Sequence, residues 1–362
     1  MKLYIGLMSG TSMDGIDAAL VDVSNNQLIA GITRPYSKTA REHLNNILSG
    51  QFVLPHHISQ LNTVLGQEFA AAVMQLVTSN STGLSDVIAI GSHGQTICHD
   101  ATAAIPYTMQ LGCPHTIAEL TGLTVVADFR TRDLVLKGRG APFAPLYHQV
   151  LFSHLAKPTA VVNIGGIANI TTFSPNKEAI GYDIGPGNCL MDAWTQCHLN
   201  TAYDKDGAWA STGTVIDSLL ADLLSDPYFL LPSPKSIGKE YFSLAWLENQ
   251  LQVAHQPEDV QATLMALTAL SIANACKQND NPVENVAICG GGAHNKALLM
   301  ALKSQLPSQD VTSTRALGVD PDYIEAMMFG WLAHQALSRT PINLKKITGS
   351  LKPVILGVIY PI

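Results

Sequence analysis

A strand, a short glycine-containing turn and a second strand occur twice along this chain, and this repeat restricts the possible folds most. The first copy covers residues 3–8, 9–15 and 16–23, and the second covers residues 159–164, 165–166 and 168–173. Walker loops and Rossmann fingerprints lead from a strand into a helix, whereas β-type residues resume directly after both turns here. The repeat therefore predicts a duplicated α/β chain with one hairpin in each half.

A later strand that ends in glycines also occurs in each half. Residues 87–90 precede a glycine-rich stretch at 91–94, and residues 286–289 precede Gly290-Gly291-Gly292. Because both correspondences keep their order along the chain, they support the duplication.

The length of 362 residues exceeds what one hydrophobic core usually organises, so two domains are expected. The predicted fold class is α/β, a two-lobed, duplicated ribonuclease H-like fold with a cleft between the lobes. We expect one lobe from residues 1–130 plus 341–362, the other from 131–340, and a hinge near residues 128–140. The apolar pattern predicts helices over residues 259–276, with Asp259 as N-cap, 295–306 and 323–337.

Composition argues against several classes of partner. The formal net charge is −7, and no run of Lys or Arg provides the cationic surface that nucleic acid requires. No apolar stretch reaches membrane-spanning length. The six cysteines have no CxxC spacing, so we expect them to be reduced and buried in a cytoplasmic protein.

The turn of the first hairpin has the chemistry of a phosphate site. Its residues are Gly10, Thr11, Ser12, Met13, Asp14 and Gly15. Backbone N–H groups and two hydroxyls suit dense hydrogen bonding to phosphate, and Asp14 could hold Mg²⁺ through a water. A plain polar hairpin turn fits the same residues equally well.

Glycines at two further turns would let a nucleotide approach the backbone. Gly290, Gly291 and Gly292 lie between a strand and a helix, and Gly165 and Gly166 form the second hairpin turn. A tight strand-to-helix crossing is the alternative for the three consecutive glycines.

Asp183 is the strongest candidate for a catalytic base. It lies at the end of a short apolar strand, before the rigid Gly185-Pro186-Gly187 loop. A carboxylate there could remove a proton from a nucleophile during phosphoryl transfer. An Asp that caps its own turn is the alternative.

Polar residues near two other predicted strands are candidates for ligand contacts. His93, Gln95 and Thr96 lie in the first-half glycine-rich turn, and Asp128 and Arg130 follow a strand at 124–127. A surface ion-pair set is preferred for Arg132 and Asp133. Capping and surface roles are preferred for Asp320 and Asp322, whereas Glu325 could face a ligand.

Taken together, six segments resemble the anhydro-N-acetylmuramic acid kinase family. They are residues 6–17, 92–96, 163–169, 183–188, 290–293 and 318–322, so the resemblance spans nearly the whole chain. Residues 138–142 depart from the family pattern, which has a second glycine and a glutamine before Gly140-Ala141-Pro142. Sugar contacts from that loop are therefore left open.

The resemblance implies the fold of actin, Hsp70 and sugar kinases, with Mg-ATP and substrate held between duplicated lobes. It implies a bacterial cytoplasmic enzyme of cell-wall recycling that converts 1,6-anhydro-N-acetylmuramic acid, ATP and water into N-acetylmuramic acid 6-phosphate and ADP. Residues Gly10 to Asp17, Ile16 included, would hold the phosphates with Mg²⁺, and Asp183 would activate water. The resemblance also suggests a homodimer.

Two other readings stay open on the same fold. One is a kinase of an ordinary sugar or small acid, in which Asp183 deprotonates a hydroxyl. The other is an actin-like or Hsp70-like ATPase module, because fold alone does not fix function.

Overall fold

The computed structural model describes residues 1–10, 15–48, 53–80, 82–174, 179–233, 235–238, 241–251, 253–278 and 283–362. The chain divides into two compact units, which we call unit 1 (Met1–Ala144 with Tyr323–Ile362) and unit 2 (Pro145–Asp322). The lobes expected from the sequence were 1–130 plus 341–362 and 131–340, and their assignment as functional domains stays a prediction.

Unit 1 is built on a sheet that has seven strands among the described residues, in the order β12-β6-β4-β1-β2-β3 with β5 paired to β4. Its strands are β1 (Leu3–Ser9), β2 (Ile16–Asp22), β3 (Gln27–Arg34), β4 (Val87–Asp100), β5 (Tyr107–Leu111), β6 (Val125–Ala127) and β12 (Val358–Tyr360). Its helices are α1 (Lys38–Leu48), α2 (Pro55–Ser79), α3 (Pro114–Thr121), α4 (Thr131–Val135) and α12 (Ile324–Leu337).

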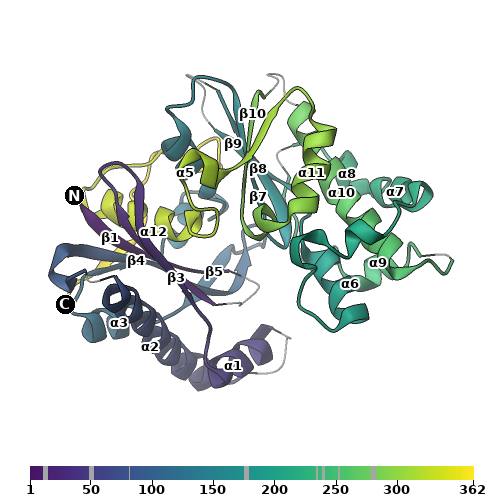
Figure 1. The fold of residues 1–362 in the computed structure, drawn as a ribbon. Helices are drawn as coiled ribbons and strands as arrows, with labels where there is room; N and C mark the ends of the chain where they lie inside the picture. Colours follow the sequence, from purple (N-terminus) through teal and green to yellow (C-terminus); the bar gives the residue numbers. More distant parts are fainter. Residues whose placement is uncertain are drawn as a thin grey trace. The chain divides into compact units, whose positions relative to one another are not determined.

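Unit 2 is built on a sheet that has five strands in the described part of the chain, in the order β11-β10-β7-β8-β9. Its strands are β7 (Thr159–Ile164), β8 (Ile167–Phe173), β9 (Ile180–Pro186), β10 (Asn285–Cys289) and β11 (Asp310–Ser313). Its helices are α5 (Ala144–Phe152), α6 (Cys189–Leu199), α7 (Asp217–Leu224), α8 (Pro227–Leu230), α9 (Leu244–Glu248), α10 (Pro257–Lys277) and α11 (Lys296–Gln305). Figure 1 shows α5 on one side of this sheet and α10 and α11 on the other.

The two sheets share one topology, which confirms the predicted duplication. In unit 1, β1, β2 and β3 pair antiparallel in succession, and β4 and then β6 add parallel to β1. In unit 2, β7, β8 and β9 pair antiparallel in succession, and β10 and then β11 add parallel to β7. Each predicted hairpin is thus the start of the same five-strand arrangement, and the expected α/β class is correct.

Each unit has its own hydrophobic core. Buried residues of α2, such as Leu65 and Phe69, pack with Ile5 and Leu7 of β1 in unit 1. Buried residues of α10, such as Leu264 and Leu267, pack with Ile164 of β7 in unit 2. A buried stripe on each long helix therefore covers one face of its sheet.

Helix α12 lies against β1 and β4 with unusually close backbone contact. A Cβ on Gly6 would lie 1.7 Å from the carbonyl oxygen of Ala326, and one on Gly91 would lie 2.0 Å from that of Phe329. Glycine is needed at both positions because any side chain would push the helix off the sheet. The contact fixes the start of α12, where Glu325 lies.

Several local predictions were wrong. Residues 91–96 continue β4 instead of forming a turn, because β5 pairs with the second half of the strand and Gly91 serves the contact with α12. The N-cap of α10 is Gln256 with Pro257 at the first helical position, so Asp259 lies inside the first turn. All six cysteines are free, but only Cys276 and Cys289 are buried, and Cys197 of α6 is exposed, so the expectation of burial is wrong for most of them.

Candidate functional site

In unit 2, Asp183 lies in the middle of β9, which continues through Gly185 and Pro186, so the predicted strand end and Gly-Pro-Gly loop at this point are wrong. Hydrogen bonds orient its carboxylate. Its Oδ2 accepts hydrogen bonds from the Ser236 hydroxyl at 2.8 Å and the Ile237 backbone N–H at 3.0 Å. Burial raises the pKa of Asp183, and these two donors oppose that rise by stabilising the ionised form. The carboxylate does not cap its own turn, because both donors come from a distant segment.

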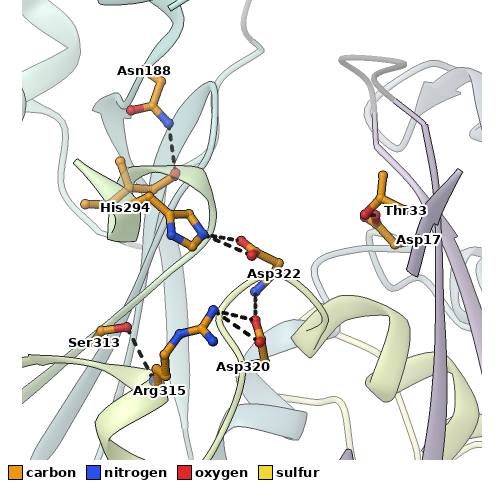
Figure 2. A network of polar contacts seen from close by, with 9 residues as sticks. Asp17, Thr33, Asn188, His294, Ser313, Arg315, Asp320 and Asp322 are labelled. Carbon is orange, nitrogen blue, oxygen red and sulfur yellow. Dashed lines mark hydrogen bonds and ion pairs between the residues drawn. The ribbon is translucent and has the colours of Figure 1, made fainter. Parts of the chain in front are cut away.

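The glycine turns predicted separately in unit 2 come together beside β9. The backbone N–H groups of Gly187 and Asn188 donate to the carbonyls of Gly166 and Gly165 at 2.9 and 2.8 Å. The Asn188 side-chain amide donates to the Ile164 carbonyl at 3.0 Å (Figure 2). The turn after β7 and the turn after β9 are thus joined into one surface.

The third glycine turn, after β10, adjoins this surface. Gly290 has a φ of 75°, and a Cβ there would lie 2.2 Å from Asn163 Oδ1. Gly291 is different, because a Cβ on it would meet only Asn188 Nδ2, at 3.6 Å. Gly165 and Gly166 also leave room for a Cβ. Gly165, Gly166 and Gly291 therefore leave backbone that a nucleotide could approach, whereas a Cβ on Gly290 or Gly292 would clash with β7, as the alternative of a tight crossing requires.

Two acidic residues before α12 form ion pairs with neighbouring basic groups. Asp322 lies 2.8 Å from His294, and Asp320 lies 3.1 Å from Arg315 and accepts from the Asp322 N–H (Figure 2). The N-cap residue of α12 is Tyr323, with no side-chain cap. The capping role expected for Asp320 and Asp322 is therefore wrong, whereas a role in exposed ion pairs is correct.

In unit 1, a buried network holds both ends of the first hairpin turn. The Ser9 hydroxyl lies 2.8 Å from the Gly15 carbonyl and 2.7 Å from Gln95 Oε1, and Gln95 Nε2 donates to the Gly10 carbonyl at 3.3 Å. Gln95 is fully buried, and its side chain connects Ser9 and the Gly10 carbonyl at the start of the turn. The predicted phosphate residues Thr11, Ser12, Met13 and Asp14 lie outside the described residues.

Next to this turn, charged and polar groups converge around Arg130. Its Nε donates to His93 Nε2 at 3.1 Å, and His93 Nδ1–H donates to the Gly94 carbonyl at 2.9 Å. Burial and the charge of Arg130 hold the pKa of His93 well below its usual range, so the ring is neutral. Burial lowers the pKa of Arg130 to about 10, and the charge of Glu325 opposes this.

Glu325 belongs to the same cluster. Burial and the negative charge of Asp17 raise its pKa, and the positive charge of Arg130 lowers it. Asp17 itself accepts a hydrogen bond from the Thr33 hydroxyl at 2.6 Å (Figure 2). The structure therefore brings together four predicted residues from four separate segments of the sequence: Asp17, His93, Arg130 and Glu325.

The remaining predicted contacts are placed differently. Asp128, with a φ of 56°, accepts from the Thr131 N–H at 3.2 Å, and the Thr96 hydroxyl accepts from Gln110 at 3.2 Å. The surface ion pair expected for Asp133 is wrong, because its side chain is 0% exposed. It accepts from the Gly140 N–H at 2.7 Å and the Thr348 hydroxyl at 2.8 Å, and so fixes the loop at 138–142.

The described residues include no cluster of three His, Cys, Asp or Glu that could bind a metal ion alone. Mg²⁺ bound together with nucleotide phosphates needs only one or two carboxylates, since phosphate and water oxygens complete its shell. The carboxylate of Asp17, at the end of the predicted phosphate turn, fits that requirement. We also find no helix in the described ranges with the length and apolarity needed to span a bilayer.

The sequence interpretation missed the residues that hold Asp183. Lys235, Ser236 and Ile237 all contact it through backbone or side-chain atoms. These three residues belong to none of the motifs recognised in the sequence. The available signal was a lysine and a serine within residues 231–238, a stretch that also contains two prolines and a glycine.

The duplicated sheets place this chain in the actin-like α/β fold class. A solved structure with this fold is (R)-2-hydroxyglutaryl-CoA dehydratase component A of Acidaminococcus fermentans. It matches with a TM-score of 0.51 and 11% identity, over 93% of this chain and 100% of that one. At this identity the match supports the fold alone.

The model of the family described as anhydro-N-acetylmuramic acid kinase matches residues 2–362. This chain therefore belongs to the anhydro-N-acetylmuramic acid kinase family. A relative with that name from Legionella pneumophila (strain Lens) is 56% identical over 362 residues, which is 100% of this chain and 99% of the relative. Another, from Pasteurella multocida (strain Pm70), is 44% identical over 99% of this chain and 96% of its own length.

Proposed function

We propose that this kinase uses ATP and water to convert 1,6-anhydro-N-acetylmuramic acid into N-acetylmuramic acid 6-phosphate and ADP. The observation that carries the proposal is the carboxylate of Asp183, which is half-buried, is oriented by two donors and lies on the strand that leads to the Gly187 turn. Such a reaction would serve cell-wall recycling in the cytoplasm. By family resemblance we also propose a homodimer, which sedimentation analysis would test.

The substrate chemistry explains why a base is needed. O6 of the anhydro sugar is bonded to C1 and carries no proton, so the base must act on a water molecule. The water oxygen bonds to C1 as the C1–O6 bond breaks, and O6 bonds to the γ-phosphorus as ADP leaves. The proton of the attacking water passes to Asp183 and then to solvent.

The nucleotide would be bound by the glycine turns. Gly165, Gly166, Gly290, Gly291 and Gly292 would lie against it in unit 2. The segment from Gly10 to Asp17 would hold the β- and γ-phosphates. Asp14 and Asp17 would help to bind Mg²⁺. Bound Mg²⁺ would supply positive charge that offsets the charge developing during phosphoryl transfer.

The sugar would be read by the cluster around Arg130. Its guanidinium suits the substrate carboxylate, and neutral His93 keeps it oriented through the 3.1 Å contact. Glu325 can accept hydrogen bonds from sugar hydroxyls once ionised. Gln95 would act indirectly by supporting the phosphate turn, and Thr96 and Asp128 are assigned to the edge of the sugar site.

Isotope labelling tests the proposal. Wild-type protein is incubated with ATP, Mg²⁺ and the anhydro sugar in ¹⁸O-water, quenched early, and the sugar product is analysed by mass spectrometry. Ring opening by water places one heavy oxygen at C1, in step with ADP release. An ordinary sugar acceptor is run in parallel, because direct phosphorylation of a hydroxyl adds no heavy oxygen beyond slow anomeric exchange.

Two outcomes would overturn the proposal. ADP release that is faster with an ordinary sugar than with the anhydro sugar would favour a simple kinase. ADP release that is independent of any sugar and rises with protein polymerisation would favour an actin-like ATPase module.

A further inference from the structure

Three consecutive residues, Lys235, Ser236 and Ile237, form hydrogen bonds with Asp183. The Asp183 N–H donates to the Lys235 carbonyl at 2.9 Å, and Oδ2 accepts from the Ser236 hydroxyl and the Ile237 N–H. Together these bonds pair the backbone and one carboxylate oxygen of Asp183 with one short segment, residues 235–237. The segment therefore sets both the position and the rotation of the carboxylate.

This segment is itself held by α8. Lys235 Nζ donates to the Tyr228 carbonyl at 2.7 Å and lies 4.4 Å from the centre of the Tyr228 ring. The Tyr228 hydroxyl donates to the Asp183 carbonyl at 2.8 Å. The contacts form a closed circuit from Asp183 through Lys235 and Tyr228 back to Asp183, and Tyr228 is only 4% exposed. The circuit therefore fixes the backbone of Asp183 relative to residues 235–237, and the bonds from Ser236 and Ile237 restrict the rotation of its carboxylate.

Hydrogen bonds to Asp226 fix the N-terminus of α8. Asp226 accepts from the Tyr228 N–H at 2.8 Å, from the Tyr241 hydroxyl at 3.0 Å and from Trp246 Nε1 at 2.9 Å. The rings of Tyr228 and Phe242 meet edge to face at 5.7 Å. The support of Asp183 thus extends into the packed interior of unit 2.

The two carboxylate oxygens of Asp183 differ in their partners. Oδ2 has two donors, whereas Oδ1 has no protein hydrogen-bond partner within the ranges that the structure describes. We infer that Ser236 is a positioning residue for the proposed reaction, and that it anchors Oδ2 so that Oδ1 is the oxygen that takes the proton from water. This inference rests on the proposed function of Asp183.

The surroundings of the carboxylate support this assignment. Among the described residues, the titratable groups near it are Tyr228 of α8, Lys235 of the segment and Tyr182 on β9 itself, while β8 places Asn169 opposite. Cys276 of α10 interacts with Tyr182. The Lys235 ammonium is directed at the Tyr228 carbonyl, so within the described part of the chain the Ser236 hydroxyl is the side chain that donates to the carboxylate.

The experiment compares Ser236→Ala with Ser236→Thr, which keeps the hydroxyl, and with Ser304→Ala as a matched control. Ser304 is also exposed and in unit 2, but its hydroxyl donates to the Ala301 carbonyl at 2.7 Å. For each protein, sugar-dependent ADP release is measured as kcat and KM between pH 4 and 9, with ATP affinity and thermal unfolding measured in parallel. Ser236 lies on the surface, so all variants are expected to fold.

We expect Ser236→Ala to lower kcat about 3- to 10-fold, with KM for the sugar and affinity for ATP unchanged. Loss of a donor to the ionised carboxylate should also move the acidic limb of the pH profile upward by about half a unit to one unit. Ser236→Thr should restore both, and Ser304→Ala should match wild type.

Other results would overturn the inference. An unmoved acidic limb in Ser236→Ala, or an equal change in Ser304→Ala, would show that the Ser236 hydroxyl does not position the base. A wild-type protein without sugar-dependent ADP release would instead refute the proposed function, so the two failures can be told apart.

Discussion

At the scale of single residues, replacement of Asp183 by Asn should abolish most of the chemistry while the fold is kept. Loss of a general base typically costs about 10²- to 10⁴-fold in turnover, so kcat should fall by that factor with ATP affinity unchanged. The amide keeps the size of the side chain and can still accept from Ser236 and Ile237. Stopped assays of ADP release and calorimetric titration with ATP measure the two effects.

Thermal unfolding is the control for Asp183→Asn. Because burial raises the pKa of this carboxyl, folding favours its protonated form, and the ionised form costs stability above the raised pKa. The variant should therefore unfold no earlier than wild type at neutral pH, and any advantage should shrink as the pH falls. Near-normal turnover in a well-folded variant would remove Asp183 from the mechanism.

The pH dependence of wild-type activity is a second residue-scale prediction. A base must be ionised, so activity should be lost as the pH falls through the raised pKa of Asp183. The acidic limb of kcat/KM should lie above the ordinary aspartate value of about 4. Residual activity of Asp183→Asn should lack this limb. A wild-type limb at or below the ordinary value would contradict the burial argument.

The sequence located Asp183 but not the residues that control it. An aspartate in a short apolar segment just before glycines has a local pattern, so it could be recognised as a candidate, although β9 continues past it to Pro186. Ser236 contacts it from 53 positions away, and no local pattern encodes such a contact. Asp133 was missed for a similar reason, because its partner Thr348 lies 215 positions away.

At the scale of elements, two neighbouring glycines in the turn after β10 should respond differently to alanine. Gly290→Ala combines a left-handed backbone with a clash against Asn163 Oδ1, so it should lower the free energy of unfolding by about 1 kcal/mol or more. Gly291→Ala meets no close atom. It should leave stability unchanged and raise the Kd for ATP, because its methyl group occupies the face proposed for the nucleotide.

Chemical denaturation and ATP titration separate these effects. Gly318→Ala is a useful control for backbone conformation alone, since Gly318 also has a positive φ of 80° but no atom within 4 Å of a built Cβ. If Gly291→Ala binds ATP as wild type does, this turn is not part of the nucleotide site.

Element type was predictable where the residue pattern was local. The hairpins, the strands before the glycines and the helices α10 to α12 follow from β-branched runs and apolar periodicity. The glycines at 91–94 led to the wrong prediction of a turn, because glycine is used both in turns and where two backbones lie in close contact. The contact with α12 that explains Gly91 joins residues more than 200 positions apart, beyond the reach of any short window.

At the scale of the whole molecule, the repeat of strand–turn–strand predicted the duplication, and the shared strand order of the two sheets confirms it. The boundaries of the two units were harder to predict. Unit 1 is completed by Tyr323–Ile362, whereas the sequence placed residues 323–340 in the other lobe and only 341–362 in this one. Helix α12 belongs there because Gly6 and Gly91 admit it to the sheet, and this reason is visible only once the sheet is assembled.

The separation of the two cores leads to a last prediction, that residues 145–322 fold on their own. This segment is continuous, and every buried member of its main apolar cluster lies between Ala160 and Val311. Expressed alone, it should show a cooperative thermal transition by circular dichroism. It should show no sugar-dependent ADP release, because Arg130, His93 and Glu325 are absent from it.

Paired core variants of the full chain test the same idea. Leu302 and Leu65 are both 0% exposed, in units 2 and 1 respectively. Either change to Ala should cost about 2–5 kcal/mol, the usual range for a buried leucine. If the cores are independent, hydrogen exchange should rise mainly in unit 2 for Leu302→Ala and mainly in unit 1 for Leu65→Ala. Equal loosening of both units, together with an unfolded 145–322 fragment, would mean that the duplicated halves stabilise each other.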